Sequence, residues 1–274
     1  MKKALLAGCL SATTLLAVAC SAESDDGLTA EDILLKSEEA MEELSSYSMT
    51  MTTTQEMSAE GDTQELEVDS EVDMLMEPLT MFQSMSMQFF GMDVSYDSYF
   101  SEEHGFFMED PMGGEWMKLS DGFTEELMSI SDMQMSPEEQ LKPFKDNLEE
   151  VSIETEEDHY VITLKGDGLD MDTMKEQVAG ITGEGMDDML GEAFDSMEVH
   201  DLEYELFIDR ETFYNTEANI FMDTTVDDGI NGFDMKQSVH LLMHSFNELD
   251  DLEIPADILE NAEEVDENEL FGEF

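Results

Sequence analysis

The hydrophobic pattern changes its period along the chain, and each change predicts a different element. Thr29, with Asp32 three residues later, resembles a capping box and predicts the start of a helix. After Tyr47, apolar and polar residues alternate instead, which predicts a half-buried β-strand. The inward face of the helix is predicted to consist of Ile33, Ser37, Ala40, Met41 and Leu44.

The same alternation recurs along most of the chain and predicts an antiparallel sheet with one face in water. Gly61 and Asp62 turn the chain into its clearest strand, which Pro78 ends. Strands of 11 to 13 residues would be roughly 35 to 45 Å long at about 3.3 Å per residue, and such sheets usually curl. The predicted strands cover residues 47–57, 66–76, 79–89, 94–100, 105–109, 115–119, 151–155, 159–165, 202–208, 218–226 and 233–246.

Helical spacing interrupts this pattern in three further places. A helix is predicted from Pro137, broken or kinked at Pro143, with its inward side made of Leu141, Phe144 and Leu148. Residues 169–197 predict two amphipathic helices separated by glycines, which form either a lid over the sheet or two packed helices. Pro255 predicts the start of a C-terminal helix that carries Ile258, Leu259 and Ala262.

The first twenty residues have the form of a secretory signal. Lys2 and Lys3 precede an apolar run that ends at Ala19, and Cys20 follows. This arrangement resembles the bacterial lipoprotein signal, in which the cysteine carries diacylglycerol and an acyl chain such as palmitate. The residues before Cys9 match that signal better, but cleavage there would leave too short an apolar segment for export. We therefore predict lipidation at Cys20, with an ordinary cleaved signal peptide as the alternative.

Removal of residues 1–19 would leave a strongly acidic chain. It takes two lysines from 10 basic residues and none of the 70 acidic ones, so the net charge becomes 8 minus 70, or −62. Such a surface repels nucleic acids and anionic headgroups, which excludes both as electrostatic partners. Because 1 M salt screens charges beyond about 3 Å, we expect a halophilic surface in a salty or alkaline habitat. One cysteine remains, which excludes a disulfide.

These features divide the chain into four parts. We predict a signal peptide over residues 1–19, the lipidated cysteine with a flexible acidic tether over 20–28, a single domain over 29–265 and an acidic tail over 266–274. The apolar run of the signal is shorter than the about 20 residues of a membrane-spanning helix. The mature protein is therefore expected on the extracytoplasmic face of the cell membrane, held by its lipid.

The order of lipidated cysteine, tether, capped helix, long strands, mid-chain helices, more strands and a terminal helix at Ile254–Ile258 is similar to the LolA/LppX-like bacterial lipoprotein superfamily. More narrowly, it resembles a Gram-positive lipoprotein family within it. The resemblance implies an α+β fold, in which a long curved antiparallel sheet, or half-open barrel, wraps around a few helices and leaves an apolar cavity. It also implies carriage of lipids or lipoproteins, as in the best understood members.

The pattern of methionines allows more than one chemical interpretation. Met-x-Met pairs recur in the strands, and thioether clusters bind copper(I). Methionine at period 2 is also typical of an adaptable apolar wall, which we favour, and a packed core explains the pattern nearly as well. His240 and His244 would lie about 13 Å apart on one strand, too far for a shared metal.

We expect a protein that binds or carries an apolar, lipid-like ligand between sheet and helices. The alternative is a protein-interaction or sensor module of the envelope with a filled core. The sequence contains no nucleophile elbow, zinc motif or calcium loop, so we expect no enzymatic activity, cofactor or metal. The residues predicted to line the ligand site are Met49, Met51, Val68, Val72, Met85, Met87, Met186, Met189, Phe194, Leu206 and Met222.

Overall fold

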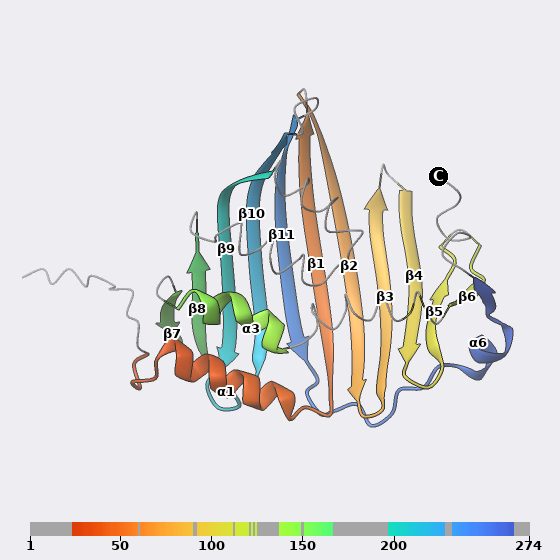
Figure 1. The fold of residues 1–274 in the computed structure, drawn as a ribbon, viewed down its shortest axis with the longest axis horizontal. Helices are drawn as coiled ribbons and strands as arrows, with labels where there is room; N and C mark the ends of the chain where they lie inside the picture. Colours follow the sequence, from red (N-terminus) through yellow and green to blue (C-terminus); the bar gives the residue numbers. More distant parts are fainter. Residues whose placement is uncertain are drawn as a thin grey trace, which may run out of the picture.

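A single twelve-stranded sheet dominates the computed structural model. The structure describes residues 24–59, 61–89, 92–111, 113–120, 122, 124, 137–148, 151–166, 197–227 and 232–265. Neighbouring strands are antiparallel except for one pair at the edge, and the sheet is a curved, open half-barrel (Figure 1). The α+β fold predicted from the sequence is therefore confirmed.

The strands follow the predicted alternation closely. Their order across the sheet is β12-β6-β5-β4-β3-β2-β1-β11-β10-β9-β8-β7. The bounds are Ser46–Ala59 (β1), Asp62–Met76 (β2), Leu79–Phe89 (β3), Met92–Ser101 (β4), Gly105–Glu109 (β5), Trp116–Leu119 (β6), Val151–Thr155 (β7), His159–Lys165 (β8), Met197–Asp209 (β9), Asn215–Asp227 (β10), Gly232–His244 (β11) and Glu263–Val265 (β12).

The pairing of β1 with β11 joins the two halves of the chain. The two strands are antiparallel from Ser48 opposite His244 to Ser58 opposite Asp234. On its other side β1 pairs with β2 along its whole length. The N-terminal strands β2–β6 and the C-terminal strands β7–β11 therefore form one continuous surface.

The first helix, α1 (Ala30–Glu42), starts with the capping box that the sequence predicted. The Asp32 amide donates to Thr29 Oγ1 (3.1 Å), and the Thr29 amide donates to Asp32 Oδ2 (3.1 Å). These bonds satisfy two amides that the first turn of a helix leaves without a partner. The Thr29 hydroxyl donates to Asp32 Oδ2 (2.7 Å), and this bond, together with the one from the Thr29 amide, holds the Asp32 carboxylate in its charged form and lowers its pKa.

The second helix, α3 (Pro137–Asp146), continues through Pro143. Of the predicted break or kink at Pro143, the break is therefore wrong, because the burial of Leu141 and Phe144 against α1 and the sheet offsets the backbone hydrogen bond that proline cannot donate. The cluster that α1 and α3 form with β7–β10 includes Ile33, Leu141, Phe144, Tyr160, Ile162 and Leu206, all at most 1% exposed.

A second cluster continues this core beneath the end of α1. It joins Met41 and Leu44 to the strands on either side of β1, through Tyr47, Met49, Val72, Met74, Met81, Phe100 and Met243. Both clusters lie on one face of the sheet, at the end of the strands where α1 runs (Figure 1). The helices therefore close one end of that face.

A third, smaller cluster lies on the opposite face, at the edge of the sheet. The predicted C-terminal helix is α6 (Ala256–Asn261), which places Ile258 with Ile254 against Phe107 of β5. After α6 the chain adds β12, parallel to β6, which the sequence did not predict. A three-residue strand is too short to show a period.

Two predicted boundaries differ from the structure. The last long strand ends at His244 and not at Phe246, where Ser245 and Asn247 adopt positive φ and turn the chain. Within the tether that was expected to be flexible, Ser24–Leu28 is bound to the sheet and its turns by hydrogen bonds with Thr155, Tyr160 and Arg210. The predicted helices over 169–197 and the acidic tail over 266–274 lie outside the described residues.

Candidate ligand-binding face

The face of the sheet that carries the helices is named the inner face here. The paired positions of the strands define it, because residues directly opposite each other point the same way. One such row runs from Val68 through Thr53 and Val239 to Ile220. The next row toward the helices runs from Met85 through Met51 to Leu206. Inner-face positions can thus be followed across the strands.

The inner face of β1–β11 carries no Asp, Glu, Lys or Arg among the paired residues that the structure describes. The contrast with the outer face is direct. On β2 the outer face presents Glu65, Glu67, Asp69, Glu71 and Asp73, while the inner face presents Leu66, Val68, Ser70, Val72 and Met74. Although the chain has 70 acidic residues, the described residues of β1–β11 therefore place none of them on the inner face.

All eight described members of the predicted ligand-lining set lie on the inner face. Three of them, Met49, Val72 and Leu206, are buried in the two core clusters. Met51, Val68, Met85, Met87 and Met222 are half-buried. The remaining three, Met186, Met189 and Phe194, fall outside the described residues.

The half-buried part continues the inner face beyond the helices, toward the tips of the long hairpins. Sequence reasoning missed several of its members, because their membership depends on cross-strand register, which has no local signal. We name the following set the upper inner face: Met51, Val68, Met85, Met87, Val94, Tyr96, Leu202, Ile220, Met222, Met235 and Val239.

Two polar side chains on the inner face donate to thioethers. Gln55 Nε2 donates to the sulfur of Met235 (2.7 Å), and the Tyr96 hydroxyl donates to the sulfur of Met85 (3.0 Å). Burial raises the pKa of Tyr96, and it raises the pKa of Tyr204 in the adjoining row to about 12. Both phenols therefore stay neutral at physiological pH, and the face remains without charge.

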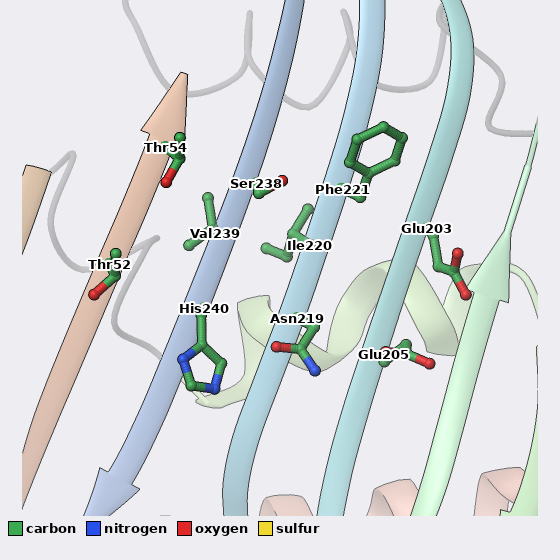
Figure 2. Close-up of a pocket in the computed structure, with 10 residues that line it drawn as sticks. All are labelled: Thr52, Thr54, Glu203, Glu205, Asn219, Ile220, Phe221, Ser238, Val239 and His240. Carbon is green, nitrogen blue, oxygen red and sulfur yellow. The ribbon is translucent and has the colours of Figure 1, made fainter. Parts of the chain in front are cut away.

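A pocket of about 300 Å³ lies on the opposite, outer face, where four strands run side by side (Figure 2). Sequence reasoning did not single out this site, because most of its residues belong to the polar side of the alternation; Ile220 and Val239 are inner-face positions. Its lining residues are Thr52, Thr54, Glu203, Glu205, Asn219, Ile220, Phe221, Ser238, Val239 and His240.

Polar and charged groups determine the chemistry of that outer pocket. His240 Nε2 lies 3.1 Å from Glu217 Oε1, and Glu203 forms an ion pair with Lys165. Lys165 does not shield the pocket from water, because its side chain is 67% exposed. A shallow site of this kind suits water and hydrophilic molecules, and it does not match the apolar ligand expected from the sequence.

Metal chemistry gains no support from the part of the chain that the structure describes. No group of three or more His, Cys, Asp or Glu side chains there could hold a metal ion. His240 and His244 belong to the same strand, β11, and both lie on its outer face. Among the described helices, none is long and apolar enough to cross a membrane.

Comparison with known families places the chain. The sequence profile of DUF6612, a family of unknown function, matches residues 29–263. The chain belongs to this family. The match begins at the capping residue of α1 and ends within β12, so the DUF6612 region is the folded sheet with its helices. No curated protein matches the chain.

Solved structures match this DUF6612 chain at low identity. A DUF1329 family protein from Desulfovibrio piger is 8% identical, covers 81% of this chain and 92% of its own, and has a TM-score of 0.26. A structure of lipovitellin, described for its lipid-protein interactions, is 9% identical over 77% of this chain and 26% of its own, with a TM-score of 0.33. A β-barrel-like DUF1849 protein from Brucella abortus is 8% identical over 73% of this chain and 98% of its own, with a TM-score of 0.21.

Proposed function

We propose that the protein is a lipoprotein anchored through Cys20 on the extracytoplasmic face of the cell membrane, and that its upper inner face binds an apolar, lipid-like ligand. The observation that carries the ligand half of the proposal is the lack of charge on the inner face of β1–β11. Apolar surface in water is unfavourable by about 25 cal/mol per Å². Covering a half-buried apolar face with an apolar molecule therefore lowers the free energy.

The composition of the upper inner face favours a ligand of variable shape. Met51, Met85, Met87, Met222 and Met235 have unbranched side chains that adapt to irregular neighbours. Among the described residues, no charged side chain on the inner face of these strands would pair with an anionic or cationic headgroup. We infer that the acyl part of the ligand lies on the sheet and that any polar part lies outside it.

The order of elements supports the same function. It resembles the LolA/LppX-like superfamily, whose best understood members carry lipids or lipoproteins, and membership of that superfamily is part of the proposal. The role is that of a binding protein and not of an enzyme. Its partners are the membrane, through the lipid anchor, and one apolar molecule.

The anchor half of the proposal rests on the sequence before the fold. A charged start, an apolar run and Cys20 together resemble a lipoprotein signal. Two or more acyl chains on one cysteine would suffice for stable attachment, even to a membrane that repels an acidic protein.

The ligand proposal is tested by measuring apolar molecules that copurify with the protein from its own membrane. Organic extraction of the wild type should release one ligand per protein molecule. Met87→Gln and Met222→Gln, which place an amide on the upper inner face, should each reduce that amount several-fold. Leu242→Gln is the matched control, because Leu242 is 38% exposed on the outer face of β11, and it should retain the full amount.

Two results would contradict the ligand proposal. Wild-type protein without any stoichiometric apolar molecule would favour the alternative of an interaction module. Equal amounts of ligand in all four proteins would place the ligand elsewhere. Thermal unfolding of each variant shows whether a loss of ligand reflects a loss of fold.

A further inference from the structure

The segment Ser24–Leu28 folds back on itself before α1 begins. The Ser24 amide donates to the Leu28 carbonyl oxygen (2.8 Å), and the Leu28 amide donates to Ser24 Oγ (2.9 Å). Gly27 has a φ of +85°, which lies in the left-handed region that glycine adopts most readily. Ser24 itself is buried. This segment is therefore a closed turn and not an extended arm.

Side chains from distant parts of the chain bind this turn to the sheet. The Tyr160 hydroxyl donates to Asp26 Oδ2 (2.6 Å), and Arg210 Nη2 lies 3.1 Å from Asp25 Oδ1 and 3.6 Å from Asp26 Oδ2. The Asp25 amide donates to Thr155 Oγ1 (3.2 Å). Tyr160 is only 1% exposed and belongs to the main core cluster. The turn is thus linked to the core cluster that α1 and α3 form with β7–β10.

The guanidinium of Arg210 connects the two strand turns at this end of the sheet. Its Nη1 donates to the Glu156 carbonyl oxygen (3.0 Å), and its Cζ lies 5.3 Å from the centre of the Tyr160 ring. Hydrogen bonds from Ser24 and Tyr160, with the charge of Arg210, lower the pKa of Asp26 to about 2. We name Ser24–Leu28 and the turns 156–158 and 210–214 the anchor corner.

Only a short length of chain separates this corner from Cys20. Four residue steps lead from Cys20 to Ser24, and a fully extended chain spans at most about 3.3–3.6 Å per residue. Ser24 therefore lies within about 14 Å of Cys20. The tip of the β1–β2 hairpin lies much farther away, because β1 alone has 14 residues, or about 46 Å at 3.3 Å per residue.

We propose that the anchor corner is the surface of the protein that faces the lipid bilayer, with the tips of the long hairpins directed away from it. This inference rests on the proposed lipidation of Cys20. Tyr214 in the corner contacts Asn247 through its hydroxyl (3.4 Å), and the Asn247 amide donates to Ser46 at the start of β1. The corner and the helix-covered end of the sheet are thus the same end, opposite the β1–β2 tip (Figure 1).

The charge of the corner indicates how it is held. The two turns contribute four acidic residues, Glu156, Glu157, Asp158 and Glu211, which outnumber the two cations of the corner, Arg210 and Lys36, whose Nζ lies 4.6 Å from the centre of the Phe213 ring. Attraction to anionic headgroups therefore contributes nothing, and the short chain to the lipid must keep the corner at the bilayer. The orientation should accordingly be the same on neutral vesicles.

The test compares two single-cysteine variants of the lipidated protein in vesicles of phosphatidylcholine. Asp158→Cys lies in the anchor corner and Asp62→Cys lies at the β1–β2 tip, and both replace exposed aspartates. The mature chain offers no other free thiol, since lipid occupies Cys20. A fluorophore on each cysteine is exposed to headgroups that carry a spin-label quencher. We expect several-fold stronger quenching at position 158 than at position 62.

A spacer variant shows whether the short length of the tether, and not membrane attachment alone, keeps the anchor corner at the bilayer. Insertion of about 12 Gly and Ser residues between 23 and 24 adds roughly 20 Å of flexible chain. Quenching at position 158 should then fall toward the value at position 62, while the protein stays bound to the vesicles. Equal quenching at the two positions without the spacer, or no effect of the spacer, would overturn the orientation. Intact mass reports lipidation separately, so an unmodified Cys20 would refute the anchor itself and remove the basis of this inference.

Discussion

The two ends of the inner face are built from the same strands but have different surroundings. At one end Met74 and Met81 are 4% and 5% exposed beneath the end of α1. Farther along the same two strands, Val68 and Met87 keep the same alternation and are half-buried. The alternation of apolar and polar residues therefore determines the face of the sheet on which a residue lies. The position of the covering helix determines how completely that residue is buried. Stability should depend on the first end and ligand binding on the second.

The largest effect is expected at the closed end. Phe144→Ala removes a fully buried ring from α3, in contact with Tyr204 at a centroid distance of 4.6 Å. Such truncations lower the free energy of unfolding by about 3 to 5 kcal/mol. Urea unfolding measures the change, with Leu259→Ala on the exposed side of α6 as control. A loss below about 1 kcal/mol would show that α3 does not close this core.

A paired truncation addresses the comparison directly. Met74→Ala at the closed end should cost about 2 to 5 kcal/mol, because it leaves a cavity in a packed cluster. Met87→Ala on the upper inner face should cost about 1 kcal/mol in protein stripped of ligand, because less apolar area is lost from burial. Equal losses in the same urea series would contradict the distinction between the two ends.

A smaller effect is expected at the start of α1, which positions the closed end. Thr29→Ala removes one half of the capping box and should lower stability by about 1 kcal/mol. Thermal unfolding against Thr29→Ser, which keeps the hydroxyl, isolates the cap. If the serine variant loses as much stability as the alanine variant, the hydroxyl is not the cause.

The smallest effect concerns pH at the anchor corner. Since the pKa of Asp26 falls from 3.8 to about 2 in the folded protein, its carboxylate favours folding at pH values above 3.8. That contribution is lost as the pH falls from 3.8 toward 2. Wild type should therefore be more stable than Asp26→Asn at pH 5, and the difference should vanish near pH 2. A difference that does not change with pH would disprove the role of the charged form.

The strands and their inward residues could be predicted because period 2 is local. Sequence reasoning thus placed Met51, Val68, Met85, Met87 and Met222 on one face, and the structure agrees. It could not separate them from the buried Met49 and Val72, because the degree of burial depends on where α1 crosses the sheet.

Non-local contacts account for most of what could not be predicted. The pairing of β1 with β11 joins residues almost 200 positions apart, and no local signal announces it. The docking of Ser24–Leu28 was missed for the same reason, since acidic residues near a terminus usually predict a solvated segment. Their partner Arg210 is 185 residues away from Asp25.

The proposed function requires that the upper inner face holds an apolar molecule. Native mass spectrometry of the lipidated protein, released gently from its own membrane, tests this most directly. We expect a complex that exceeds the mass of the lipidated chain by one apolar ligand, which is lost on mild activation. A mass equal to the lipidated chain alone, in protein that is still folded, would contradict it.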